Sequence, residues 1–317
     1  MGNDTAYSPS MNHAPRALFL ALLALHWLIS TGCVTLRPWA EATRELAAER
    51  FVEVEGRKVA IERRGSGEPL VLLHGFGEST YAFEKVLPSL AMRFDVVALD
   101  LNGFGFTQRP RDRSSYTLEG QARLVLAVMD RLGFTRARLG GHSYGGGIAL
   151  FLAATHPERV ERLLLIDNAL PRYAQDRRSP LFRWCWVANL ATKSIGLSDR
   201  RIREGLRAAY YDDALVTPAL VREYAERLRI EGAVDAYRGL IGPSAEPPFE
   251  LDLSTIAQPT LVVWGEEDGL IPVAGARQRS ARMPNARFVS IPACGHTPME
   301  ECPEPFLAAA LPFLLER

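Results

Sequence analysis

One stretch of this sequence decides the fold: Ala137-Arg-Leu-Gly-Gly-His-Ser143-Tyr-Gly-Gly-Gly-Ile-Ala-Leu150. It matches the pattern G-x-S-x-G, which is weak evidence alone but specific where a strand precedes it and a helix follows. Here apolar residues precede the motif, and a small, apolar helical pattern follows it. The residues two before and two after the serine must be small in such a sharp turn, and both are glycine. The stretch predicts a reactive serine, Ser143, lifted off a sheet at the start of a helix.

Ser143 needs a general base, because a serine hydroxyl is a poor nucleophile near neutral pH. His296 lies on a loop directly after a late strand-like run at residues 287–291. The other histidines lie in an N-terminal leader, in an early loop, in the serine motif or in a turn away from any strand end: His13, His26, His74, His142 and His156. We therefore expect His296 to be the base.

The base needs an acid that orients it, placed after a strand and before the histidine in chain order. Residues 264–272 contain three acids after an apolar run, and we expect Asp268 to be the orienting one. Glu266 and Glu267 are expected to face solvent. Asp167, which follows the preceding apolar run, remains the alternative acid.

Two backbone N–H groups must bind the oxyanion that forms when a serine attacks a carbonyl. One is expected from Tyr144, the residue after the nucleophile. The other is expected from Phe76, in the early loop His74-Gly-Phe-Gly, where the flanking glycines give the backbone room to turn. His74 is expected to brace this loop by hydrogen bonds.

Strand-like and helical segments alternate along most of the chain. Apolar runs at 69–74, 96–100, 162–167 and 260–265 alternate with helical patterns at 118–132 and 147–155, after an antiparallel pair at 51–62. This alternation predicts an α/β fold with a mostly parallel sheet and helices on both faces. Residues 169–250 contain only helical patterns, one of them beginning at Thr217-Pro218. They predict an all-helical insertion.

Five motifs in this order resemble the α/β-hydrolase fold family: the His74 loop, residues 100–107, the Ser143 turn, the Asp268 loop and Gly295-His296. The resemblance covers residues 51–317. It implies a hydrolase core at 51–168 and 251–317 and a helical cap at 169–250, the place where this family carries its cap. The loop 100–107 departs from the usual family pattern, because Phe104 and Phe106 make it unusually apolar.

Residues 1–33 have the layout of an export signal. Arg16 precedes an apolar run at 17–29, which is shorter than the about 20 residues that a membrane-spanning helix needs. The run ends at Ser30-Thr-Gly-Cys33, which resembles a bacterial lipoprotein signal whose cysteine is lipidated, although Ser30 stands where leucine is usual. We expect an exported lipoprotein anchored through Cys33 and joined to the core by a linker at 34–50. A plain signal peptide with a periplasmic or secreted product is the alternative, and either Met1 or Met11 is the start.

The amino-acid composition limits the classes of partner and cofactor that we expect. The 37 basic and 37 acidic residues balance, so no excess positive charge favours nucleic acid. The four cysteines follow no disulfide or zinc pattern, and Cys185, Cys294 and Cys302 are expected to be free or buried, with Cys294 close to the catalytic histidine. We expect no metal and no cofactor. The sequence leaves the oligomeric state open.

A serine nucleophile favours acyl transfer to water over epoxide opening or dehalogenation, which the resemblance assigns to members with an aspartate nucleophile. The leading hypothesis is a carboxylic ester hydrolase, esterase- or lipase-like, that acts on an apolar ester through an acyl-serine intermediate. An aromatic stripe at 181–190 lines the pocket in this view, or is simply core. A C–C bond or amide hydrolase with the same triad is the first alternative. A non-catalytic envelope lipoprotein is the second.

An aminopeptidase would want acidic residues in the helical insertion to hold a free amine. Glu204, Asp212 and Asp213 are the candidates there. Each of them is more readily explained as part of a solvated helix face.

Overall fold

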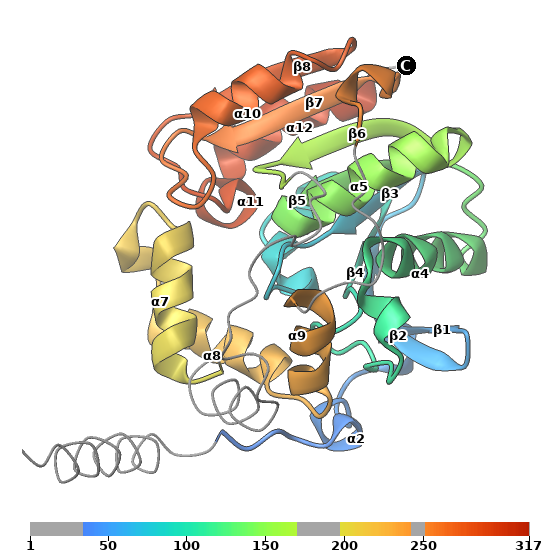
Figure 1. Cartoon of the computed structure of the whole chain (residues 1–317), viewed down its shortest axis with the longest axis vertical. Helices are drawn as coiled ribbons and strands as arrows, with labels where there is room; N and C mark the ends of the chain where they lie inside the picture. The colour runs from blue at the N-terminus through green and yellow to red at the C-terminus, as the bar shows by residue number, and fades with distance from the viewer. Residues whose placement is uncertain (1–33, 170–196, 242–250, 317) are drawn as a thin grey trace, which may run out of the picture.

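The computed structural model describes residues 34–169, 197–241 and 251–316, which build one eight-stranded sheet with helices on both faces (Figure 1). In chain order the strands are β1 (Phe51–Val54), β2 (Arg57–Arg64), β3 (Glu68–Leu73), β4 (Phe94–Leu99), β5 (Ala137–His142), β6 (Val160–Ile166), β7 (Thr260–Gly265) and β8 (Ala286–Ile291). Their order across the sheet is β1-β2-β4-β3-β5-β6-β7-β8. Only the β1–β2 and β2–β4 pairs are antiparallel. The predicted mostly parallel α/β sheet is confirmed.

The central strands are apolar throughout because both of their faces are covered. Side chains alternate along a strand, so Leu70 and Leu72 of β3 pack into one core layer. Val71 and Leu73 point to the opposite layer. The strands β4, β6 and β7 divide their residues between the two layers in the same way. This double burial holds the carboxyl ends of the parallel strands in fixed positions, and the candidate site lies at those ends.

Helices close the two faces of the sheet. One layer contains α4 (Leu118–Arg131), α5 (Ser143–Thr155) and α10 (Val273–Ser280). The other contains α3 (Leu87–Ala91) and α12 (Pro303–Leu315), while the short α11 (Pro298–Glu301) follows the His296 loop. The Thr117 side chain accepts a hydrogen bond from the Gly120 N–H at 3.1 Å, which explains why α4 begins where the sequence predicts.

Three α-helices lie in the described residues between β6 and β7, and we call them the helical insertion: α7 (Asp199–Ala209), α8 (Pro218–Leu228) and α9 (Ala233–Ile241). Figure 1 shows them at one end of the sheet. The predicted helix start at Thr217-Pro218 is observed, with the Thr217 hydroxyl accepting from the Leu220 N–H at 3.2 Å. The aromatic stripe at 181–190 and the leader 1–33, including Cys33, lie outside the described residues.

The linker between the leader and the core packs against the helical insertion. Arg37 donates its N–H to Arg229 O at 2.9 Å and accepts from Glu231 N–H at 2.8 Å, between α8 and α9. Two residues on, in α2 (Trp39–Ala42), the Trp39 indole donates to Phe106 O at 2.8 Å. The first described residues are therefore fixed to the insertion and to the loop after β4.

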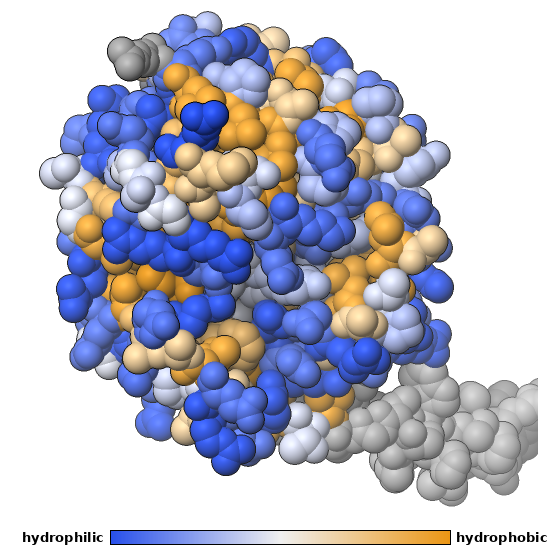
Figure 2. All heavy atoms as spheres, turned by 180° about the vertical axis from the view of Figure 1, so that it is seen from behind, coloured by the Kyte–Doolittle hydropathy of each residue, from blue (hydrophilic) through white to orange (hydrophobic). Residues whose placement is uncertain are grey.

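The outer surface is mainly hydrophilic on the face shown in Figure 2, with apolar side chains exposed in separate patches. No helix in the described ranges is long and apolar enough to cross a membrane.

Candidate active site

Ser143 lies at the turn between β5 and α5, in the left-handed region at φ 46°. The turn is tight: a Cβ added at Gly145 would lie 2.3 Å from Leu73 O, and one at Gly141 would lie 2.5 Å from Gly145 O. These contacts explain why the motif needs glycine at both positions. Tyr144 is the second residue of α5, so its N–H has no partner within the helix and can serve an oxyanion.

His296 and Asp268 meet as the sequence predicts. His296 Nδ1 lies 2.7 Å from Asp268 Oδ2, and both side chains are buried. Asp268 Oδ1 accepts the N–H groups of Leu270 and Ile271 at 2.8 and 2.9 Å. Burial raises the pKa of Asp268, but the hydrogen bond and charge of His296 outweigh burial and leave the pKa below its ordinary value. Asp268 is thus a carboxylate aimed at His296 Nδ1.

Asp167, the alternative acid, contacts Asp268. Its carboxyl group accepts the Gly265 N–H at 3.0 Å and shares a hydrogen bond with the Asp268 side chain. Burial and the charge of Asp268 raise the pKa of Asp167 well above its ordinary value, so Asp167 holds a proton. Glu266 and Glu267 are exposed.

The loop after β3 lies against the Ser143 turn. The Phe76 ring contacts the Tyr144 ring edge-to-face, with 6.4 Å between centroids. In the described part of the chain, the Phe76 N–H has no acceptor, which leaves it free to bind an oxyanion. His74 braces this loop, as expected: its Nδ1 lies 2.7 Å from Gly75 O, and its Nε2 accepts the Leu101 N–H at 3.0 Å.

Glu78 and His142 join the three segments of the site, and no sequence motif marks Glu78 as a site residue. Glu78 Oε2 accepts the Gly75 N–H at 2.6 Å and contacts His142 Nδ1 at 2.8 Å. His142 Nε2 lies 2.7 Å from His296 O. Burial lowers the pKa of His142, but the charge and hydrogen bond of Glu78 and the hydrogen bond to His296 O together outweigh burial and raise the pKa. Burial raises the pKa of Glu78, but the charge and hydrogen bond of His142, with the charge of His74 and the Gly75 N–H, together outweigh burial and lower the pKa, so the pair is ionic.

Glu300 connects the catalytic loop to the helical insertion. Its carboxyl oxygens accept the hydroxyls of Tyr210 and Tyr224 at 2.7 and 2.5 Å. Burial, followed by the charge of Glu78, raises the pKa of Glu300 to about 7. His296 N–H also donates to Ala209 O at the end of α7, which lies beside α11 in Figure 1. The insertion therefore holds the loop that carries the base.

Cys294 is buried, as expected, but Cys294 and Cys302 are not free, because they form a disulfide with Cα atoms 6.2 Å apart. The bond closes a loop that contains His296. The sequence spacing matches no common framework, and the two cysteines meet because the chain turns back into α11 between them. Cys185 lies outside the described residues.

Four aromatic residues, Phe76, Phe104, Tyr144 and Tyr237, form a cluster that we call the aromatic wall and that includes the residue after Ser143. The Phe76 ring contacts those of Phe104 and Tyr237 with 5.3 Å between centroids in each case. Tyr237 belongs to α9, so the insertion completes the wall. The rings pack edge-to-face, with Phe104 fully buried and Phe76 exposed.

Neither compact group of possible metal ligands in the described ranges offers an open site. In the group Cys294, Glu301 and Cys302, both sulfur atoms are bonded to each other in the disulfide. In the other, Asp167, Asp268 and His296, the facing atoms already share hydrogen bonds. In the described residues, His296 and Asp268 are paired, and His142, the residue before Ser143, contacts the backbone of the His296 loop.

The model of the alpha/beta hydrolase fold family matches residues 68–303. This chain belongs to the α/β-hydrolase fold family. It is 30% identical over 287 residues to 2-hydroxymuconate semialdehyde hydrolase of Pseudomonas sp. (strain CF600), covering 84% of this chain and 94% of that protein.

Solved structures of two kinds resemble this hydrolase. The meta-cleavage product hydrolase CumD of Pseudomonas fluorescens IP01 is 26% identical, with a TM-score of 0.68 over 84% of this chain and 98% of that one. A membrane phospholipase A, described as a bacterial virulence factor, is 28% identical, with a TM-score of 0.67 over 95% of this chain and 96% of that one.

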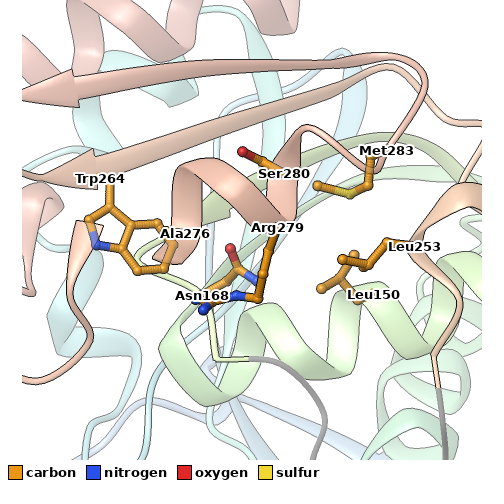
Figure 3. Close-up of a pocket in the computed structure, with 8 residues that line it drawn as sticks. All are labelled: Leu150, Asn168, Leu253, Trp264, Ala276, Arg279, Ser280 and Met283. Carbon is orange, nitrogen blue, oxygen red and sulfur yellow. The ribbon is translucent and has the colours of Figure 1, made fainter. Parts of the chain in front are cut away.

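One small pocket, lined by none of Ser143, Asp268 and His296, lies between α5, β7 and α10 (Figure 3). Asn168, Trp264 and Arg279 are among its lining residues. Its volume of about 10 Å³ holds roughly one water molecule, so it is no substrate site.

The acidic candidates for binding a free amine are all exposed. Glu204 is exposed and pairs with Arg200 and Arg201. Asp212 is exposed and accepts the Ala214 N–H at 2.9 Å, and Asp213 is exposed. These contacts are those of solvated helix ends and faces.

Proposed function

We propose that the protein is a serine hydrolase of carboxylic esters. The Ser143 hydroxyl attacks the ester carbonyl while its proton passes to His296. Asp268 orients His296 by a hydrogen bond to Nδ1. The oxyanion is bound by the Phe76 and Tyr144 N–H groups. The tetrahedral intermediate then expels the alcohol, which takes the proton from His296, and leaves an acyl-Ser143 ester. Water, deprotonated by His296, attacks this ester and releases the acid.

The observation that carries the ester proposal is the aromatic wall, which includes the residue after Ser143. Phe76 and Tyr144 supply both the proposed oxyanion N–H groups and part of the wall, so a carbonyl bound there has its acyl chain next to aromatic rings. Such a surface binds an apolar acyl group by burying it from water. The likeness to a membrane phospholipase A supports the same substrate class.

Cleavage of a C–C bond is the second candidate. The observation in its favour is the 30% identity to 2-hydroxymuconate semialdehyde hydrolase over 94% of that protein. The likeness to the CumD structure agrees with it. The same nucleophile, base and oxyanion groups would serve this reaction, so substrate binding separates the two candidates.

A panel of p-nitrophenyl esters with graded acyl chains tests the ester proposal against the C–C candidate. We expect turnover that rises with chain length and is abolished in Ser143→Ala. The same preparations are given a 2-hydroxy-6-oxo-dienoate, and we expect slower or no cleavage. Efficient cleavage of the dienoate with negligible ester turnover would replace the ester proposal. If Ser143 in the folded protein fails to react with a fluorophosphonate, both enzymatic candidates fail and a binding lipoprotein gains support.

We also propose that the protein is exported and held at the bacterial cell envelope by a lipid on Cys33. The Cys294–Cys302 disulfide supports export, because disulfides persist in oxidising compartments. The linker contacts with residues 229–231 would put the helical insertion next to the anchor.

Fractionation of cells tests the anchor. Wild-type protein is expected in the membrane fraction, and Cys33→Ala in the soluble fraction with unchanged ester turnover. Deletion of residues 17–29 should prevent export and serves as the control for the signal itself. An unchanged membrane location of Cys33→Ala would contradict the lipid anchor without bearing on the enzymatic proposal.

A further inference from the structure

Asp167 occupies an unusual position behind the triad. Its backbone is in the left-handed region at φ 39°, which is uncommon for residues other than glycine and asparagine. Its side chain has no exposed surface. The Asp167 N–H continues the sheet by donating to Val263 O at 3.0 Å, and two residues on the Ala169 N–H donates to Ser143 O at 2.9 Å. The bend at Asp167 thus turns the chain from β6 towards the nucleophile.

Two carboxyl groups meet there inside the protein. Asp167, Asp268 and His296 have side-chain atoms that all lie within 4.8 Å of one another. Two carboxylates in contact cannot both be ionised at low cost, so the pair holds one proton.

The neighbouring donors show which carboxyl group holds this proton. Asp268 accepts three N–H groups, from His296, Leu270 and Ile271. Asp167 accepts the single N–H group of Gly265. Asp268 has more hydrogen-bond donors to stabilise its negative charge, so the proton lies on Asp167.

We propose that Asp167 is a positioning residue of the triad: a neutral carboxylic acid whose O–H donates to the Asp268 carboxylate and holds it against His296 Nδ1. Asp268 then has donors on every side, which restrains its rotation. The burial of Asp167, which raises its pKa, favours the protonated form. The strained backbone at Asp167 is retained because it aims the side chain at Asp268.

The inference rests on the proposed triad, and variants at residue 167 test it. Asp167→Asn keeps an N–H donor and tolerates the left-handed backbone, whereas Asp167→Gly removes the donor without adding backbone strain. Glu55→Gly makes the same backbone change at an exposed residue with φ 50° next to the edge strand β1, and is the matched control.

The readouts are the rate of Ser143 phosphonylation by a fluorophosphonate, the kcat and KM for an ester, and the low-field NMR signal of the His296 Nδ1 proton. Asp167→Gly is expected to lower kcat and the phosphonylation rate by about 10-fold with KM little changed, and to weaken the NMR signal. Asp167→Asn should recover most of that loss, and Glu55→Gly should match wild type. A wild-type rate for Asp167→Gly, or an equal loss in Asp167→Asn, overturns the proposal.

If Asp167→Gly does not fold, the pH dependence of ester turnover by Asp167→Asn still tests the proposal. It should superimpose on the wild-type profile from about pH 5 to 9, because a neutral group replaces a neutral group. A shifted acidic limb would mean that Asp167 is ionised and would overturn the proposal. The NMR signal is read without any substrate, so a failure of the ester proposal is distinguishable from a failure here.

Discussion

His142 directly precedes Ser143, the proposed nucleophile, and its imidazole contacts the backbone of His296, the proposed base. The His142 Nε2 atom lies 2.7 Å from His296 O. The two rings are 4.9 Å apart between centroids. Because the other nitrogen contacts Glu78, both nitrogens donate and the ring is an imidazolium. The Glu78–His142 ion pair therefore ties the Ser143 turn to the oxyanion loop and to the His296 loop.

Glu78→Gln should lower the free energy of unfolding by about 3 kcal/mol, because it leaves the His142 charge buried without its partner. Glu78 contributes to the free energy of unfolding above pH 4.5, its ordinary pKa, and this contribution is lost as the pH falls through the lowered pKa of Glu78 in the folded protein. That of His142 is present below pH 6.5 and is lost as pH rises through its raised value. The difference between wild type and variant should thus be largest between pH 4.5 and 6.5. Urea unfolding across pH measures it, and a difference independent of pH would contradict the ion pair.

Glu300 predicts a fall in stability as pH rises. Its pKa increases from 4.5 in the unfolded chain to about 7 in the folded protein. The contribution of Glu300 to the free energy of unfolding is therefore fully present below pH 4.5, and about 3 kcal/mol of it is lost between pH 4.5 and 7. Glu300→Gln should abolish this loss, whereas Glu304→Gln, an exposed change on α12, should keep it. Unfolding of the variants at pH 5 and 8 checks the prediction, and an equal fall in Glu300→Gln would refute it.

Replacing both cysteines of the disulfide by serine should lower the free energy of unfolding by about 2 kcal/mol, since the bond closes a loop with a sequence separation of 8. The same change frees the loop around His296 and should slow phosphonylation of Ser143. Mass spectrometry of unreduced peptides checks that the bond exists in the exported protein. Free thiols at Cys294 and Cys302 in that sample would contradict it.

Tyr237→Ala opens the aromatic wall from the side of the insertion. It should increase the ratio of kcat/KM for long over short acyl esters by about 10-fold, because a short chain then leaves part of the enlarged pocket unfilled. Tyr211→Ala removes an exposed tyrosine from the same insertion and should leave the ratio unchanged. An equal effect of the two changes would show that the wall does not contact the acyl chain.

The sheet and the Ser143 turn could be predicted because their signals are local. Apolar runs give the parallel strands, and the glycines around Ser143 are required by contacts within a few residues and with β3. The preference for Asp268 over Asp167 also agrees with the contacts of His296. These features depend on spacing along the chain, which a single sequence displays.

The supporting network could not be predicted, since it depends on which strands are neighbours. Glu78 follows β3 and His142 ends β5, and they meet because these strands are adjacent in the sheet. Glu300 meets Tyr210 and Tyr224 only after the insertion has folded over the loop. Nothing in the local sequence around these residues marks them as partners.

Mass spectrometry of the intact enzyme, quenched during turnover of a long-chain ester, tests the central claim most directly. We predict an adduct with the mass of the acyl group, located on the peptide that contains Ser143 and absent in Ser143→Ala. An enzyme that cleaves a 2-hydroxy-6-oxo-dienoate but forms no acyl adduct and releases no acid from any ester would contradict the account.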